Sequence, residues 1–185
     1  GQELIGVSEN AGEICAAKIP ANETPCWLCA RLRRGILYTR ARALGVNKLA
    51  LGHHADDCIE TLFLNACFAG QLKGMPPKFL SDDRQVTVIR PFAYVWEKTI
   101  IDFAEELAFP IIGCACGVAC ELIPTRRHEA KRLLAKLEKT IPDAKQNLLV
   151  AMKSPRLSHL LIPPKRVKEL ADELNALVEG PKEES

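Results

Sequence analysis

Apolar positions recur with helical spacing in several stretches of the chain, and short apolar runs separate some of these stretches. The longest, 27–44, has apolar residues three to five positions apart and stops at Gly45, which predicts a helix of about four to five turns. A brief apolar run over 48–52 predicts a buried parallel strand, and the pattern over 57–69 predicts the next helix. Helix, strand, helix is the order typical of a doubly wound α/β sheet.

The rest of the chain predicts two more strands, a loop and further helices. The candidate strands are 4–7 and 86–91, the glycine- and proline-rich loop is 70–83, and the helices are 12–18, 97–108, 125–139, 143–152 and 166–178. We therefore expect a mainly parallel, doubly wound α/β domain over 1–122 and a helical region over 123–178. A polar, disordered tail is expected over 179–185.

Composition narrows the class of protein. The chain has 185 residues, of which 48% are hydrophobic, and a net charge of +2. The hydrophobic content predicts a globular domain with a substantial core. The net charge is too small to indicate nucleic-acid binding by itself. No run reaches the roughly 18–20 apolar residues that a membrane helix needs, so we expect a cytoplasmic protein. In a reducing compartment the eight cysteines favour metal binding or catalysis over disulfides.

The cysteines form two groups that are far apart in the sequence. Cys26 and Cys29 form a CxxC pair, whose thiolates can converge on one metal, and Cys114, Cys116 or Cys120 could complete such a site. Zinc and an iron–sulfur cluster both fit this spacing, which does not choose between them. The remaining cysteines fit small buried hydrophobic positions; they are residues 15, 58 and 67.

Polar residues follow the strand expected over 48–52, in the order GHHADD from Gly52 to Asp57. Glycine permits a ligand to approach the backbone, histidine offers hydrogen bonds, and an aspartate at a helix start can hold Mg²⁺. For Asp56 a simple N-cap role explains the sequence as well. Arg33 shares a helix face with Cys29, so a cation lies beside the cysteine pair. Together with Arg31 and Arg34, Arg33 could bind phosphate groups of ATP or RNA.

Several of these blocks resemble one known family, the tRNA 2-thiocytidine synthetases of the TtcA type. They include PCWLCARLRRGILY, LALGHHADD and KGMPPK, and together they cover 25–38, 49–57, 61–65, 73–78, 88–91, 109–112 and 158–160. The family is part of the PP-loop ATPase superfamily, so the resemblance implies an adenine nucleotide alpha-hydrolase-like, Rossmann-like fold. It also implies that ATP adenylates a cytidine in the tRNA anticodon loop and that a [4Fe-4S] cluster provides sulfur.

The resemblance also implies roles for individual residues. Cys26 and Cys29 match two cluster ligands, and Cys120, with Cys116 as the alternative, is the expected third. Asp57 matches the acidic residue of the nucleotide site, which uses Mg²⁺, and Arg33 matches the basic residue after the CxxC. Gly52 and His53 are expected beside the nucleotide. The implied partners are tRNA and a sulfur donor such as a cysteine desulfurase, and a homodimer is compatible with the family.

One departure from the superfamily pattern affects the nucleotide site. The Ser-Gly-Gly-x-Asp-Ser type loop of the superfamily is absent from the sequence, so we expect the fold to be incomplete and ATP binding to be impaired in the chain as it stands. Two other functions remain open. One is a zinc-stabilised RNA-binding module, and the other is a related sulfurtransferase that acts on uridine or on another substrate.

Overall fold

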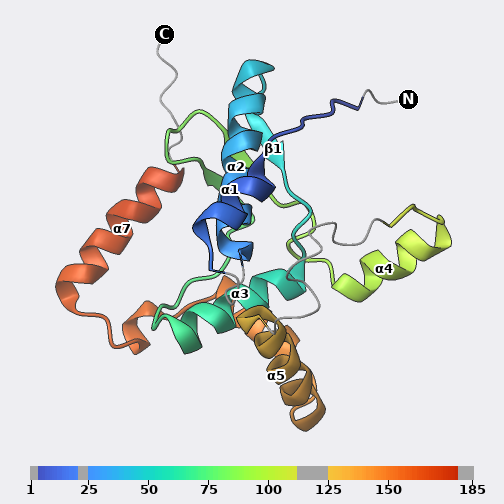
Figure 1. Cartoon of the computed structure of the whole chain (residues 1–185). Coiled ribbons are helices and arrows are strands. Elements are labelled where there is room, and N and C mark those ends of the chain that lie inside the picture. Colours follow the sequence, from blue (N-terminus) through green and yellow to red (C-terminus); the bar gives the residue numbers. More distant parts are fainter. Residues whose placement is uncertain (1–3, 21–24, 112–124, 179–185) are drawn as a thin grey trace.

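The structure is a computed structural model that describes residues 4–20, 25–111 and 125–178. Helices dominate these residues, and three short strands lie among them (Figure 1). The elements are α1 (Ala11–Lys18), α2 (Cys26–Ala43), β1 (Lys48–Ala50), α3 (Ala55–Phe68), β2 (Lys78–Leu80), β3 (Thr87–Ile89), α4 (Glu97–Glu106), α5 (Arg126–Thr140), α6 (Ala144–Lys153), the 3₁₀ turn η1 (Leu157–His159) and α7 (Pro164–Val178).

The described strands form one sheet in the order β1-β3-β2. β1 and β3 are parallel, with Leu49 opposite Val88, and β2 pairs antiparallel with β3, with Lys78 opposite Ile89. The carboxyl ends of β1 and β3 and the start of β2 therefore lie at one edge of the sheet. Ligands of α/β proteins bind at this carboxyl edge.

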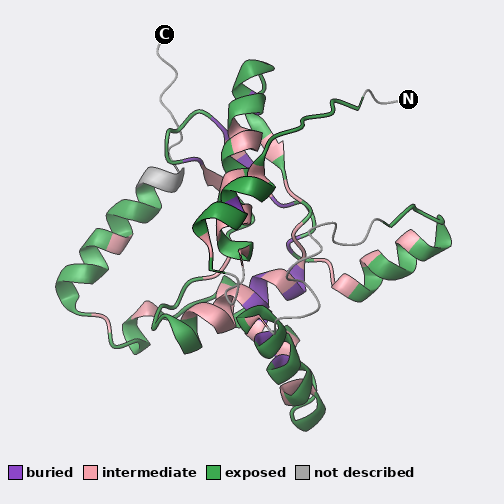
Figure 2. Cartoon of the chain, in the orientation of Figure 1, coloured by how far each residue is buried: buried purple, intermediate pink, exposed green. Residues whose placement is uncertain are grey.

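The hydrophobic core lies mainly between helices. Ala55 and Ile59 of α3, Leu134 of α5 and Leu149 of α6 are each at most 5% exposed and form one cluster. Figure 2 shows this buried group where α3 meets α5. The first turn of α3 thus carries both core residues and the polar residues that follow β1.

Local sequence explains where the helices begin and end. The α5 N-terminus is capped by Thr125, whose Oγ1 accepts a hydrogen bond from the His128 amide at 3.2 Å. Gly45 follows the end of α2 with a φ of +66°, a left-handed conformation that glycine adopts without strain. No helix in the described part of the chain is long and apolar enough to cross a membrane.

The α/β class is confirmed, and every predicted helix is present within a few residues of its expected bounds. Three expectations about strands are wrong. Residues 4–7 form no strand and are exposed. The parallel strand β1 is not buried, because Lys48 and Ala50 are exposed at the sheet margin. The loop 70–83 contains β2, a strand that its glycines and prolines conceal.

Candidate active site

The CxxC pair lies on the first turn of α2. Pro25 precedes the helix and accepts the Cys29 amide with its carbonyl at 2.9 Å, which leaves Cys26 exposed and Cys29 half-buried. Thiolates are stabilised at a helix N-terminus because the unpaired amides there carry partial positive charge. Both side chains thus suit metal ligation. Cys114, Cys116 and Cys120 lie outside the described residues, so the expected third ligand does too.

A third thiol approaches the pair from α1, which packs against α2. Cys15 is only 6% exposed. Burial raises the pKa of the Cys15 thiol, and negative charge on Cys29 and Cys26 raises it further. In the described part of the chain, no group of three or more His, Cys, Asp and Glu side chains is arranged to hold a metal ion. Cys15 is therefore a buried neighbour of the pair.

Asp57 lies at the start of α3, directly after the carboxyl end of β1. Its backbone amide donates to Nδ1 of His54 at 3.4 Å, and its Oδ2 accepts from the His54 amide at 3.1 Å. This reciprocal capping box uses two groups that would otherwise lack partners at a helix start. The capping box fixes the Asp57 carboxylate at the functional edge of the sheet.

Arg127 of α5 joins this edge to the C-terminal helices. Its Nη2 donates to Oδ1 of Asp57 at 2.7 Å, and its Nε donates to Oε2 of Glu60 at 2.9 Å. Glu60 is only 6% exposed, so the arginine neutralises a carboxylate that would otherwise be buried with its charge. One cation thus connects α5 to two successive turns of α3.

Asp56 has a different role from its neighbour. Its Oδ2 accepts the Glu97 amide of α4 at 2.8 Å, and its Oδ1 pairs with Lys145 of α6 at 2.9 Å. Burial alone would raise the pKa of Asp56, but these two partners outweigh burial and hold the pKa below its ordinary value. The carboxylate therefore ties three helices together.

Among the residues that the structure describes, two buried nitrogen atoms at this edge have no hydrogen-bond partner. They are Nδ1 of His53 and Nε of Arg90, the residue that follows β3. Arg90 is 9% exposed, donates to the Pro76 carbonyl through Nη1 and lies over the Phe79 ring at 5.0 Å. Buried polar atoms are nearly always paired, so unpaired ones at a site edge indicate a missing acceptor or donor. An anion is suited to the arginine.

Positive charge surrounds His53. Burial lowers the pKa of His53; Asp57 opposes this shift, whereas Arg90, Arg127 and Arg33 favour it. The charge of Arg33 thus reaches His53 as well, with the smallest effect of the three arginines. A side chain at Gly52 would meet only open space, so a ligand can reach the backbone there.

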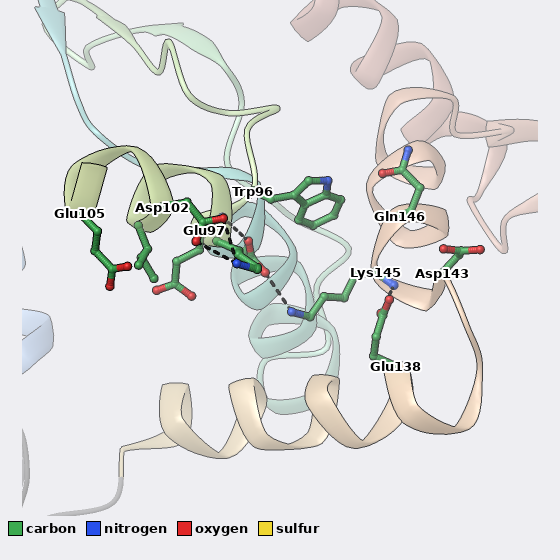
Figure 3. A pocket seen from close by; sticks show the side chains of 11 residues that line it. Trp96, Glu97, Asp102, Glu105, Glu138, Asp143, Lys145 and Gln146 are labelled. Carbon is green, nitrogen blue, oxygen red and sulfur yellow. Dashed lines mark hydrogen bonds and ion pairs between the residues drawn. The ribbon is translucent and has the colours of Figure 1, made fainter. Parts of the chain in front are cut away.

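An acidic cavity of about 590 Å³ lies on the other side of Asp56 (Figure 3). Its walls come from α4 and from the start of α6, with Trp96, Glu97 and Lys145 around its inner end. Carboxylates dominate its rim, namely those of Asp102, Glu105, Glu138 and Asp143. Such a surface repels a polyanion.

Sequence reasoning missed Arg90, Arg127 and Cys15 as neighbours of the site. Arg90 had one available signal, its place directly after a strand, where α/β proteins carry functional residues. Arg127 had no such signal, because it lies in a helix whose many basic residues look like an ordinary solvated face. Contacts across 70 positions of the sequence do not follow from helical periodicity.

Comparison with known proteins adds a family to this geometry. The chain is 50% identical over 161 residues to a tRNA-cytidine(32) 2-sulfurtransferase of Sorangium cellulosum, which corresponds to 86% of the chain and 56% of that protein. A protein of the same name from Geobacter sulfurreducens is 51% identical over 136 residues, which correspond to 74% of the chain and 52% of that protein. Another, from Salmonella typhimurium, is 48% identical over 161 residues, which correspond to 86% of the chain and 51% of that protein. The chain is homologous to these tRNA-cytidine(32) 2-sulfurtransferases.

The homology confirms the resemblance that the sequence blocks indicated. The chain spans about half the length of the curated relatives it matches. No protein-family profile matches it. Among solved structures, a U34-tRNA thiolase, NcsA from Methanococcus maripaludis with its [4Fe-4S] cluster, has a TM-score of 0.61 at 24% identity, over 84% of the chain and 50% of that protein. This likeness supports the Rossmann-like α/β fold.

Proposed function

We propose that the protein containing this chain transfers sulfur to a cytidine of tRNA, with ATP activating the acceptor carbonyl and a [4Fe-4S] cluster as the sulfur-delivering group. One observation carries the proposal: a chain about 50% identical to tRNA-cytidine(32) 2-sulfurtransferases has its CxxC pair on the first turn of α2, a helix that contacts β1. The CxxC pair is the part that an iron–sulfur cluster needs, and the residues after β1 are the part that a nucleotide site needs.

Cys26 and Cys29 fit the cluster. Their thiols stand one helical turn apart at a helix start, a geometry that lets two sulfurs ligate one cluster. Cys120 is the proposed third ligand, with Cys116 as the alternative. When bound, the cluster supplies the sulfur that replaces the activated oxygen. Arg33, on the same face of α2, offsets negative charge beside it.

Gly52, His53 and Asp57 are the proposed nucleotide-binding residues. The open space at Gly52 admits a ligand, and the unpaired nitrogens of His53 and Arg90 fit phosphate oxygens. Arginine beside the reacting phosphate stabilises the charge that grows there as AMP leaves. Asp57 would hold the Mg²⁺ that accompanies ATP, and its Oδ1 would then exchange the contact with Arg127 for the metal.

Mass spectrometry of tRNA nucleosides tests the reaction. The complete reading frame that contains this chain is expected to restore 2-thiocytidine in a strain that lacks its own thiolase, and the variants Asp57→Asn and Arg33→Ala are expected to abolish or strongly reduce it. An Arg132→Ala variant, which changes an exposed arginine of α5, controls for loss of charge. Restoration of 2-thiouridine in place of 2-thiocytidine would assign the uridine reaction.

Metal analysis tests the cluster independently of activity. After anaerobic reconstitution, iron and sulfide are expected in a ratio close to one to one, with cluster absorbance that the Cys26→Ser and Cys29→Ser variants lose. One stoichiometric zinc without sulfide would instead support a zinc-stabilised RNA-binding module. Four expectations stay predictions: the tRNA partner, a cysteine desulfurase as sulfur donor, the homodimer and the cytoplasmic location.

A further inference from the structure

A second cavity lies at the same edge of the sheet as the proposed nucleotide site. It has a volume of about 330 Å³ and is enclosed by residues 74–77, by Cys58 of α3, by Tyr94 and by the end of α6. Because Lys78 pairs with Ile89, the segment 74–77 must lie beside the carboxyl end of β3. Arg90 connects the two places: its amide donates to the Pro77 carbonyl at 2.8 Å, and its Nη1 donates to the Pro76 carbonyl.

The walls of this cavity are mostly apolar. Met75, Pro76 and Pro77 form one wall, and Leu149 and Met152 of α6 form another. Ligand pockets in proteins typically measure about 300–1,000 Å³ and have this kind of lining. A volume at the low end of the range suits one flat ring system.

An aromatic ring and a cation stand at the mouth. Tyr94 is 54% exposed, and Nζ of Lys153 lies 4.5 Å from the centre of its ring. Aromatic rings provide stacking surfaces for unstacked nucleobases, and Lys153, which lies over one face of the Tyr94 ring, can bind the phosphate of a nucleotide whose base stacks on the other face. These features match the parts of a nucleotide. The apolar cavity and the half-exposed ring suit its base, and the cation suits its phosphate.

Gly74 keeps the cavity open. A Cβ atom at this position would lie 2.3 Å from Cε of Met152 and would push the methionine side chain out of its place. The absence of a side chain at Gly74 therefore lets Met152 pack along the wall. Methionine adapts well to a flat ring because its side chain is unbranched and polarisable.

We propose that this cavity binds one unstacked nucleobase of the RNA substrate, held against Tyr94 with its phosphate at Lys153. The inference rests on the proposed function, since it names where that RNA is held. An enzyme that reacts with a base edge must take the base out of its stack, and a pocket at the same edge of the sheet as the proposed nucleotide site provides a place for it. The acidic cavity beyond Asp56 cannot serve, because its carboxylates repel phosphate.

The test measures binding of a tRNA anticodon-arm RNA whose loop carries 2-aminopurine at one position, with the protein from the complete reading frame. Wild-type protein is expected to bind the RNA and to raise the 2-aminopurine fluorescence as the base leaves its stack. Tyr94→Ala is expected to weaken binding roughly 5- to 150-fold, the range of base–aromatic stacking. Tyr94→Phe is expected to stay within about 2-fold, because the ring remains.

Two further variants separate stacking from charge and from folding. Lys153→Gln is expected to weaken binding and to lower the number of counterions released on binding, measured from the salt dependence of the affinity, by about one. Phe103→Ala, which removes an exposed aromatic ring of α4 outside this cavity, is the matched control and is expected to bind like wild type. Circular dichroism and iron content should be the same in all of these proteins.

The outcomes distinguish the two proposals. If wild-type protein forms 2-thiocytidine and binds the RNA, but Tyr94→Ala binds it equally well, the base pocket is wrong and the proposed function stands. If wild-type protein neither binds the RNA nor thiolates tRNA, both proposals fail. Equal losses in Tyr94→Ala and Phe103→Ala would also overturn the pocket.

Discussion

Arg127 of α5 donates a hydrogen bond to the Asp57 carboxylate at 2.7 Å, although the two residues lie 70 positions apart. The carboxylate proposed for the nucleotide site is therefore held by a helix from the C-terminal region. Glu60 accepts a second hydrogen bond from the same guanidinium. Helix α5 thus shapes the site as well as packing against α3.

Removal of this cation should weaken the attachment of α5 to α3. Arg127→Ala leaves Glu60 buried without its partner and is expected to lower the free energy of unfolding by about 1–2 kcal/mol, less than a fully buried pair because the arginine side chain is 46% exposed. Urea unfolding measures the change. Arg132→Ala, on the exposed side of the same helix, should change stability by less than about 0.5 kcal/mol. Equal effects of the two substitutions would contradict the role of Arg127.

Asp56 should make stability depend on acid. Its pKa is held below the ordinary value of 3.8, so the folded state favours the charged form. The stabilisation is therefore present above pH 3.8 and is lost as the pH falls below this value and through the folded-state pKa. Asp56→Asn should lower stability at pH 7 and flatten the acid part of the profile in urea titrations. Asp82→Asn, at an exposed carboxylate, should leave the profile unchanged.

His53 should remain neutral at pH 7. Burial holds the pKa of His53 below its ordinary value of 6.5, so unfolding becomes easier as the pH falls below 6.5 and the unfolded histidine gains a proton. An NMR titration of its ring protons should show the lowered pKa. In the protein from the complete reading frame, added ATP should raise this pKa, because phosphate near Nδ1 favours the protonated ring. No change on adding a saturating concentration of ATP would argue against a nucleotide beside His53.

The cysteines should separate into ligands and neighbours. Cys26→Ser, Cys29→Ser and a variant at the third ligand should each lose iron after reconstitution, and comparison of Cys120→Ser with Cys116→Ser identifies that ligand. Cys15→Ala should keep the iron, because Cys15 is a buried neighbour in this geometry. Iron content per chain is the measurement, with the exposed Cys67→Ser as the control.

A methyl group at Gly74 should affect the proposed base pocket more than the fold. Gly74→Ala forces Met152 to move, but a flexible methionine end can shift at a cost of about 1 kcal/mol or less. The RNA affinity should fall because the displaced side chain narrows the cavity. The double variant Gly74→Ala/Met152→Ala should recover part of this affinity. A large loss of stability with unchanged affinity would contradict the prediction.

The sequence predicts the helices well, because each carries apolar residues at helical spacing over several turns. Short strands are harder. β2 has three residues within a glycine- and proline-rich segment, and its existence depends on pairing with β3. The run 4–7 is apolar yet forms no strand, because apolar residues alone do not provide a neighbouring strand.

The candidate site shows the same division. Sequence motifs and helical periodicity predict residues that lie within a recognisable block, such as Cys29, Arg33 and Asp57. Arg90 and Arg127 depend on how distant segments pack, and neither period nor composition contains that information. The different partners of Asp56 and Asp57 also emerge only from the fold, since two adjacent aspartates look alike in the sequence.

The position of β1 affects how the chain should behave in solution. Among the described strands β1 pairs only with β3, so its other edge has no strand partner within the described part of the chain. Such an edge is a template for another strand, from the same protein or from a second molecule. The solubility of this chain should therefore depend on what covers β1, and a covering strand should suppress concentration-dependent aggregation.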